Sequence, residues 1–131
     1  MERRPCLLVA DDEKEIRNFL KRALESGGYN VVLAPNGREA LAMYQEHKPD
    51  LIILDIMMPE LSGLEVLSIL RQNSNVPIIM LTDKSEVTAL DTALGLGADD
   101  FVQKPFHMRE LVSRIKAKLR RTARDDSVLS E

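Results

Sequence analysis

The sequence predicts an α/β fold in which helices cover both faces of a parallel β-sheet. Two observations carry this prediction. Short runs of apolar residues alternate with helical patterns five times along the 131 residues, and no internal repeat or low-complexity stretch interrupts them. Strands joined by helices run parallel, and right-handed crossovers give a doubly wound sheet. The length fits one domain.

The expected strands are the apolar runs of the chain. They are Cys6–Ala10 and residues 31–34, 51–54, 78–81 and 101–102. The run Leu51-Ile52-Ile53-Leu54 has no polar residue and is β-branched at its centre, which is typical of a strand buried on both faces. The sequence therefore predicts a sheet with helices packed against each of its two sides.

The first helix is predicted from apolar spacing. Apolar residues at i, i+3, i+4, i+7 and i+8 from Ile16 give it one apolar face, and Gly27-Gly28 marks its end. Asp12 and Glu15 have the spacing of a capping box at its start. We therefore expect this helix to follow the first strand directly.

Capping signals predict the next helices. Asn36 with Glu39, and Ser62 with Glu65, have capping-box spacing before apolar patterns. A less regular helix is expected over about residues 86–94, and a last one from about residue 108. Its apolar pattern stops after residue 121, so we expect residues 125–131 to be tail or linker.

Composition excludes several classes of function. A net charge of −3 gives no support for bulk binding to nucleic acid. The single cysteine, Cys6, excludes an internal disulfide and suits a reducing compartment. The apolar run that follows the charged amino terminus is too short for a signal peptide or a membrane span. We expect a soluble, cytoplasmic protein with no membrane partner.

Polar residues follow four of the predicted strands at the point where each strand ends. Asp11 and Asp12 follow the first strand, Asp55 the third, Thr82 the fourth and Lys104 the fifth. In open α/β sheets, ligands bind outside the carboxyl ends of the strands. We therefore expect these five side chains to form one site.

Three carboxylates in one site need a cation or a raised pKa to coexist. Carboxylates suit a hard cation, so Mg²⁺ is the expected cofactor. With Mg²⁺ bound, Asp55 stays ionised and can attack an electrophilic phosphorus to form an acyl phosphate. Lys104 can neutralise one phosphoryl oxygen, and Thr82 can donate a hydrogen bond to another.

Each residue also has a structural interpretation when it is taken alone. Asp11 and Asp12 can cap the first helix, Thr82 can be a strand-end threonine, and Lys104 can be a solvated lysine. A plain surface role for Asp55 conflicts with the apolar run before it. The five residues together are specific, whereas each one alone is not.

The chain resembles the response regulator receiver domains of bacterial two-component signalling. The resemblance covers about residues 6–121 and is carried by the following segments: Asp11-Asp12, Asp55-Ile56-Met57-Met58-Pro59 with Gly63, Thr82, and Lys104-Pro105-Phe106. It implies a flavodoxin-like (βα)5 fold with strand order 2-1-3-4-5. We take residues 1–122 as the receiver and 123–131 as the tail or the start of a linker to an effector domain that this chain lacks.

The resemblance also assigns roles to the site residues. Asp55 is the expected phospho-acceptor, and Thr82 and Lys104 assist it. Asp12, Asp55 and the backbone carbonyl of Met57 are the expected Mg²⁺ ligands, with Asp11 acting mainly through water. It further implies a cis Lys104–Pro105 peptide bond and makes Phe101, with Thr82, the expected switch residue. Such a domain is not an enzyme for other substrates: it catalyses its own phosphoryl uptake and a slow autodephosphorylation.

The segment at residues 97–101 and the end of the chain are similar to the OmpR/PhoB-type subfamily, whose receivers precede a winged-helix DNA-binding domain. The resemblance implies a sensor histidine kinase as partner, a homodimer on phosphorylation, and DNA contact only through an effector domain. The expected dimer face is formed by Leu90, Asp99, Asp100, Glu110, Arg114 and Lys116. Leu90 and Gly95 stand where the subfamily tends to have charges, so we expect a weaker, partly apolar dimer.

Three other functions share part of this pattern. A haloacid-dehalogenase-type phosphatase needs Asp-x-Asp after the first strand, whereas Asp11 and Asp12 are adjacent. A flavodoxin needs a Ser/Thr-rich phosphate loop there, and acids would repel the phosphate. The third alternative is a degenerate receiver that acts as a phosphorylation-independent interaction module. The complete five-residue set argues against it, but Asp83 keeps it open, because the family usually has a small residue after the threonine.

Overall fold

The strands form one parallel sheet whose order confirms the prediction. In the computed structural model, which describes residues 3–83 and 87–129 and their side chains at 3–83 and 88–121, the order is β2-β1-β3-β4-β5. The strands are β1 (Cys6–Ala10), β2 (Asn30–Ala34), β3 (Leu51–Asp55), β4 (Ile78–Thr82) and β5 (Asp100–Gln103). Because the order reverses next to β1, the carboxyl ends of β1 and β3 lie side by side at a topological switch point.

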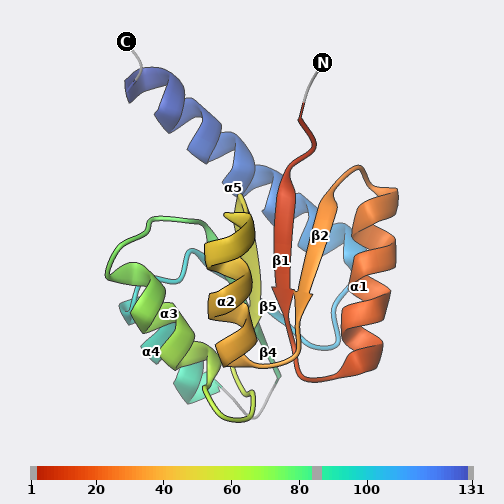
Figure 1. Ribbon diagram of the computed structural model, residues 1–131, viewed down its shortest axis with the longest axis vertical. Helices are drawn as coiled ribbons and strands as arrows, with labels where there is room; N and C mark the ends of the chain where they lie inside the picture. Colours follow the sequence, from red (N-terminus) through yellow and green to blue (C-terminus); the bar gives the residue numbers. More distant parts are fainter. Residues whose placement is uncertain (1–2, 84–86, 130–131) are drawn as a thin grey trace.

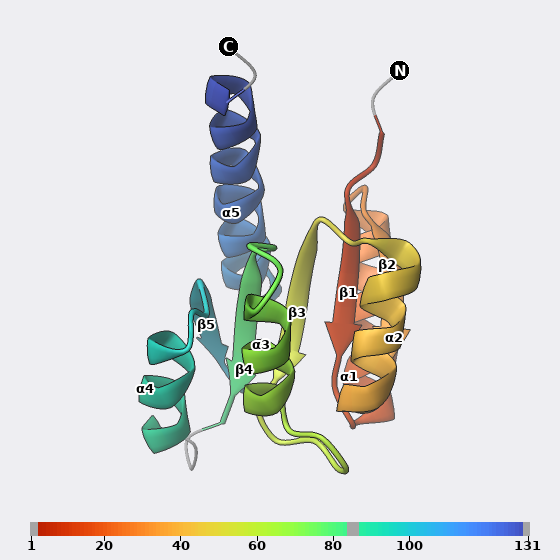
Figure 2. The same ribbon diagram turned by 60° about the vertical axis from the view of Figure 1, so that its left-hand side comes forward.

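Helices cover both faces of the sheet (Figures 1 and 2). They are α1 (Lys14–Ser26), α2 (Gly37–His47), α3 (Gly63–Arg71), α4 (Val87–Gly95) and α5 (Met108–Leu129). Helices α2, α3 and α4 share one core with the sheet, and α1 and α5 share the other. The distal part of α5 extends past the amino ends of the strands (Figure 2).

The central strands are apolar on both sides because each face of the sheet has its own core. In β3, Ile52 and Leu54 belong to the α2–α3–α4 core, whereas Leu51 and Ile53 belong to the α1–α5 core. All four are fully buried. The absence of polar alternation in the sequence therefore reflects a strand covered on both sides, as expected for a parallel sheet.

The helix starts agree with the capping signals in two cases and differ in one. Asn36 accepts from the Glu39 N–H, and Ser62 and Glu65 form a complete capping box. The expected Asp12–Glu15 box is wrong: Glu13 occupies the cap position and its side chain makes no capping hydrogen bond. The Asp11 side chain bonds the backbone at the start of α1 instead, because its Oδ1 accepts from the Glu13 N–H at 2.9 Å.

One further boundary differs from the expected one. Helix α5 continues to Leu129, so the expected tail from residue 125 is largely helical. The periodicity that predicted an end after residue 121 reports contact with the core, and a helix can extend beyond that contact. Helix α4 begins at Val87; residue 86, where its start was expected, lies outside the described residues. The Lys104–Pro105 bond is cis, as the resemblance implied.

Gly63 allows α3 to begin directly against the end of β3. A Cβ built on Gly63 would overlap the carbonyl oxygen of Asp55, and the Gly63 N–H donates to the Ile56 carbonyl at 2.8 Å. The chain therefore folds back tightly after Asp55, and only a residue without a side chain fits this approach.

Replacing Gly63 by Ala should lower the free energy of unfolding by about 2 kcal/mol, because backbone atoms cannot yield as a flexible side chain can. Gly95→Ala is the matched control, since a Cβ there meets nothing within 4 Å. The control should be neutral or stabilising by up to about 1 kcal/mol. Urea unfolding of the three proteins measures both effects, and equal stabilities would show that the approach to Asp55 is loose.

Candidate phosphoryl-transfer and metal site

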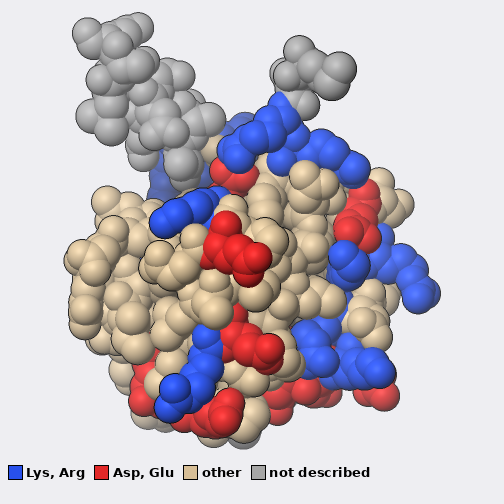
Figure 3. All heavy atoms as spheres, viewed as in Figure 1, with Lys and Arg blue, Asp and Glu red and all other residues tan. Residues whose placement is uncertain are grey.

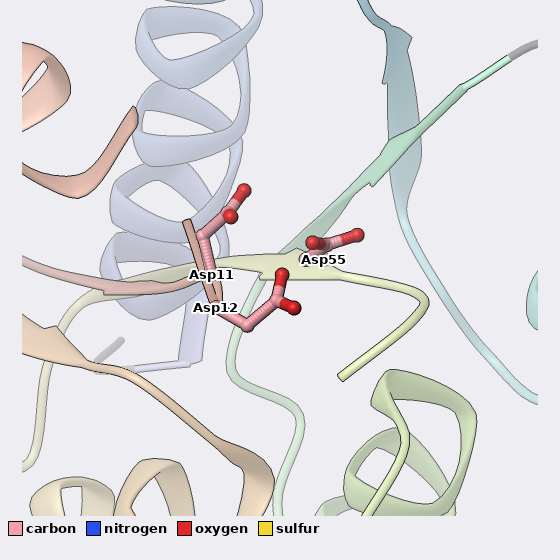
Figure 4. A group of neighbouring side chains, drawn as sticks. All are labelled: Asp11, Asp12 and Asp55. Atoms are coloured by element: carbon pink, nitrogen blue, oxygen red, sulfur yellow. The ribbon is translucent and has the colours of Figure 1, made fainter. Parts of the chain in front are cut away.

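The five residues expected to form one site meet at the carboxyl ends of the strands. Asp11 follows β1, Asp55 is the last residue of β3, Thr82 is the last residue of β4, and Lys104 follows β5. Carboxylate oxygens of Asp11, Asp12 and Asp55 all lie within 4.8 Å of one another. Figure 4 shows the three side chains pointing toward a common region from the ends of β1 and β3.

Burial differs among the three acids. Asp11 and Asp55 are buried, whereas Asp12 is exposed. Asp55 Oδ1 accepts from the Met57 N–H at 3.3 Å. Asp11 Oδ2 is buried and has no hydrogen-bond partner among the described residues. The group nearest to this oxygen is the ammonium of Lys104, whose Nζ lies 3.0 Å away.

Lys104 supplies the positive charge of the site. Its Nζ lies 3.0 Å from Asp11 Oδ2 and 3.3 Å from Asp55 Oδ2, with 15% of the side chain exposed. The contact with Asp11 is an ion pair without hydrogen-bond geometry. The Lys104 N–H donates to the Thr82 carbonyl, which fixes the lysine to the end of β4. Lys104 therefore bridges two carboxylates from two different strands.

Glu13 is a site residue that the sequence reasoning missed. Its Oε1 lies 3.5 Å from Lys104 Nζ, and 56% of its side chain is exposed. Glu13 follows the Asp11-Asp12 pair directly, so its place in the acidic run was the available signal. Exposed pairs of this kind contribute little stability, but Glu13 adds a third carboxylate around one ammonium group.

Thr82 is buried, and its hydroxyl donates to the Asp83 carbonyl at 3.1 Å. In this arrangement the hydroxyl is occupied by the backbone of the next residue. Asp83 itself is exposed. Phe101, the other expected switch residue, is half-buried and packs against the α2–α3–α4 core. Thr82 and Phe101 lie on the neighbouring strands β4 and β5, where Thr82 pairs with Gln103 and Phe101 pairs with Met80.

The charges of the site perturb its ionisable groups. Burial raises the pKa of Asp55 to about 7, and the Asp11 carboxylate adds to this rise, while Lys104 and the Met57 N–H oppose it. Burial acts to lower the pKa of Lys104, but the contacts with Asp11 and Asp55 outweigh it and raise that pKa above its ordinary value. One lysine therefore does not compensate the acids, and a divalent cation would restore the balance.

The donor set fits Mg²⁺. Three carboxylates within 4.8 Å of one another offer the hard oxygen ligands that this ion prefers. In the described part of the chain, the group of acidic, histidine and cysteine side chains that could hold a metal contains aspartates alone, so neither an imidazole nor a thiolate takes part. Figure 3 shows acidic side chains gathered along the lower edge of the view, toward which the strands of Figure 1 point.

The residues expected at a dimer face are mostly engaged within the chain. Arg114 bonds Asp100 at 2.9 Å and lies 3.5 Å from Glu110, which is one helical turn away. Leu90 is half-buried, and Lys116 is exposed on α5. Apart from these two and Asp99, the expected face thus consists of internal ion pairs: Arg114 joins α5 to β5 through Asp100, and it pairs with Glu110 within α5.

Asp99 has a structural role that the sequence did not indicate. Its Oδ2 accepts from Arg71 at 2.7 Å and from the Ile78 N–H at 2.8 Å, and its Oδ1 accepts from Arg121 at 2.9 Å. Only 17% of its side chain is exposed. Asp99 therefore joins the start of β4 to α3 and α5.

Comparison with known proteins agrees with this geometry. The profile of the response regulator receiver domain family matches residues 7–116. The chain is 46% identical to a probable transcriptional regulator, ycf27, of Galdieria sulphuraria, over 92% of this chain and 48% of that protein. It is 46% identical to the response regulator MprA of Mycolicibacterium vanbaalenii, over 92% of this chain and 52% of MprA. The chain thus spans about half the length of these relatives.

Solved structures show the same architecture. The receiver domain of the Francisella response regulator 1452 superposes with a TM-score of 0.84 at 39% identity, covering 90% of this chain and 98% of that one. NtrX from Brucella abortus superposes with a TM-score of 0.90 at 28% identity, covering 98% of this chain and 29% of NtrX. Within residues 3–83 and 87–129, no helix combines the length and the apolar character needed to cross a membrane.

The raised pKa of Asp55 predicts how stability depends on pH without metal. The folded protein holds a proton on Asp55 up to about pH 7, whereas an unfolded chain loses it near pH 4. Stability therefore falls as pH rises from about 4 to 7. Asp55→Asn removes this loss, so in a chelator the variant should gain on the order of 2 kcal/mol over the parent by pH 8 and little at pH 4.

Urea unfolding across this pH range measures the difference. Asp12→Asn is the control, because it removes an exposed carboxylate from the same site and should change stability much less. A stability difference between Asp55→Asn and the parent that stays constant from pH 4 to pH 8 would contradict the raised pKa.

Proposed function

The chain belongs to the response regulator receiver family, of the OmpR/PhoB type that its sequence indicated, and from this premise we propose that Asp55 accepts a phosphoryl group from a sensor histidine kinase. The observation that carries the proposal is the position of Asp55. It is buried at the end of β3, 3.3 Å from the Lys104 ammonium and within 4.8 Å of two further carboxylates. This arrangement combines a nucleophile with charge compensation for a phosphoryl group.

Asp11, Asp12 and Asp55, with the backbone carbonyl of Met57, are the residues that would hold Mg²⁺. The bound ion supplies positive charge that keeps Asp55 ionised at neutral pH and offsets the charge of an incoming phosphoryl group. By the resemblance to the family, Asp11 would act on the ion mainly through water.

In the transfer step, an oxygen of the Asp55 carboxylate forms a bond to phosphorus while the phosphorus–nitrogen bond of the donor phosphohistidine breaks. The electron pair of that bond stays on the imidazole nitrogen, which takes a proton from solvent. Lys104 donates to a phosphoryl oxygen from a position already 3.3 Å from Asp55. Thr82 donates to another oxygen after its hydroxyl leaves the Asp83 carbonyl.

Movement of Thr82 is the expected link to the output. When its hydroxyl turns toward the phosphoryl group, space opens beside β4 for Phe101, which packs partly buried on the neighbouring β5. A charge change at one site can bias a two-state element of this kind. The surface of α4, β5 and α5 would then favour a two-fold dimer. DNA would be bound by a separate effector domain, for which the relatives, about twice as long as this chain, have room.

Phosphorylation should place one phosphoryl group on Asp55. Intact mass measurement after incubation with Mg²⁺ and a small acyl-phosphate donor should show one added group on the parent and none on Asp55→Asn. Asp91→Asn, which removes an exposed carboxylate from α4, is the matched control and should be modified like the parent. Equal uptake by Asp55→Asn would disprove the assignment.

The same experiment separates the second candidate function. A parent that takes up no phosphoryl group under these conditions would favour the degenerate receiver, and Asp83 is the residue on which that alternative rests. A fourth carboxylate beside an incoming dianion opposes its approach. Uptake by Asp83→Ala but not by the parent would identify Asp83 as the cause.

Dimerisation should follow activation and depend on Arg114. In sedimentation experiments with the acyl-phosphate mimic beryllofluoride, the parent should associate, and Arg114→Glu should weaken association about ten-fold because reversal at a charged interface adds repulsion. Arg22→Glu, an exposed position on α1, makes the same change of net charge and should leave association unchanged. A parent that stays monomeric in both states, or an Arg114→Glu dimer of normal strength, would contradict the proposed face.

A further inference from the structure

The turn that carries two of the proposed metal ligands is held by a cation on the first helix. Arg17 lies in α1, and its Nη1 donates to the backbone carbonyl of Asp11 at 2.8 Å. Arg17 is half-buried. Its side-chain bond is additional to the pairing of the helix, because the Arg17 backbone N–H bonds the Glu13 carbonyl.

The bonded carbonyl lies between the two acids. The Asp11 carbonyl and the Asp12 N–H belong to one rigid peptide plane. The Asp11 N–H donates to the Ala34 carbonyl at 3.1 Å, and Asp11 Oδ1 accepts from the Glu13 N–H at 2.9 Å. Arg17 adds the remaining restraint on the oxygen of that plane, so the direction in which the chain leaves Asp11 is set.

Asp12 depends on this restraint more than its neighbours do. Among the described residues, no hydrogen bond or ion pair holds the exposed Asp12 side chain, whereas Asp11 and Asp55 each contact Lys104. The Asp12 carboxylate therefore depends on its backbone, and not on side-chain contacts, for its place within 4.8 Å of the other two. A group that fixes the Asp11–Asp12 peptide limits the positions that the third ligand can take.

We propose that Arg17 is a positioning residue for the Mg²⁺ site, which it serves by holding the Asp11–Asp12 peptide so that the Asp12 carboxylate faces Asp55. The proposal rests on the proposed function, since it needs Mg²⁺ to bind at the three carboxylates. Groups that orient metal ligands from the second layer commonly change metal affinity ten-fold or more when they are removed.

A simple electrostatic role makes the opposite prediction. A guanidinium group near a cation site repels the incoming ion, so a residue that acted only through its charge would weaken Mg²⁺ binding, and its removal would strengthen it. The direction of the change in affinity therefore distinguishes positioning from charge. A purely structural role would lower thermal stability and leave the affinity of the folded protein unchanged.

The test is a titration of the whole chain with Mg²⁺, in which the amide NMR shifts report binding at a temperature well below that of unfolding. Arg17→Ala should bind Mg²⁺ about ten-fold more weakly than the parent. Arg17→Lys, which keeps the charge and one donor but loses the fork, should lie between them. Arg22→Ala, an exposed arginine of the same helix, is the matched control and should bind like the parent.

A second readout needs no metal. In the metal-free protein, the amide resonances of Asp12 and Glu13 should move in Arg17→Ala and stay in place in Arg22→Ala, because the turn loses its restraint. If Arg17→Ala does not fold, Arg17→Lys provides both comparisons.

Each outcome is decisive. Unchanged or tighter Mg²⁺ binding by the Arg17 variants, with a parent that binds Mg²⁺, would overturn the role of Arg17 alone. A parent that gives no Mg²⁺-dependent shifts at Asp11, Asp12 or Asp55 would overturn the proposed metal site and the role of Arg17 together.

Discussion

The contact of one ammonium group with carboxylates from two strands is the interaction on which the rest of the site depends. Lys104 reaches Asp11 and Asp55 at 3.0 and 3.3 Å, and it is mostly buried with them. Removing either partner of such a buried arrangement leaves an uncompensated charge, which is costly. Burial raises the pKa of Asp55, and the Asp11 carboxylate raises it further, because the two acids exceed the lysine in charge. The site therefore forms with an excess of negative charge, and this charge favours the binding of a cation.

The parallel sheet makes this imbalance possible. A strand that is apolar on both faces can place a polar residue only at its end, and parallel strands bring their carboxyl ends to one edge. Leu54 is fully buried immediately before Asp55, and Leu81 immediately before Thr82. Each functional side chain is thus fixed by a core residue next to it in the sequence. Gly63 completes the arrangement by letting α3 start against the Asp55 carbonyl.

The parts of the molecule that depend on neighbouring residues in the sequence were predictable. Apolar runs gave the strands, the alternation gave the fold class, and strand ends gave the site residues. The strand order came from the resemblance and not from the pattern itself. The Asp12–Glu15 box was wrong because another local contact competes with it. The Asp11 side chain accepts from the Glu13 N–H, and Glu13 occupies the cap position in place of Asp12.

Contacts between distant residues carried no signal in a single sequence. Asp99 is typical of a surface acid in the sequence, but it contacts Arg71 and Arg121 because the end of α3 and the middle of α5 lie beside the start of β5. Glu13 and Arg17 read as solvated helix residues, but the turn after β1 brings one to Lys104 and the other to the Asp11 carbonyl. Each of these charged residues has several oppositely charged residues in the sequence with which it could pair, and the fold determines which of them it contacts.

The two ends of β5 are held in different ways, and this difference bears on how a signal could leave the site. At its amino end, Arg71 donates to the Gly97 carbonyl at 2.9 Å and to Asp99 at 2.7 Å, so the connection from α4 is anchored to α3 by a largely buried pair. At its carboxyl end, β5 pairs with β4, and the Lys104 N–H donates to the Thr82 carbonyl, beside a hydroxyl that bonds the Asp83 carbonyl. If Thr82 turns toward a phosphoryl group as proposed, the rearrangement would begin at this end. A signal that leaves the site through Thr82 would therefore act on the end of β5 that Arg71 does not anchor.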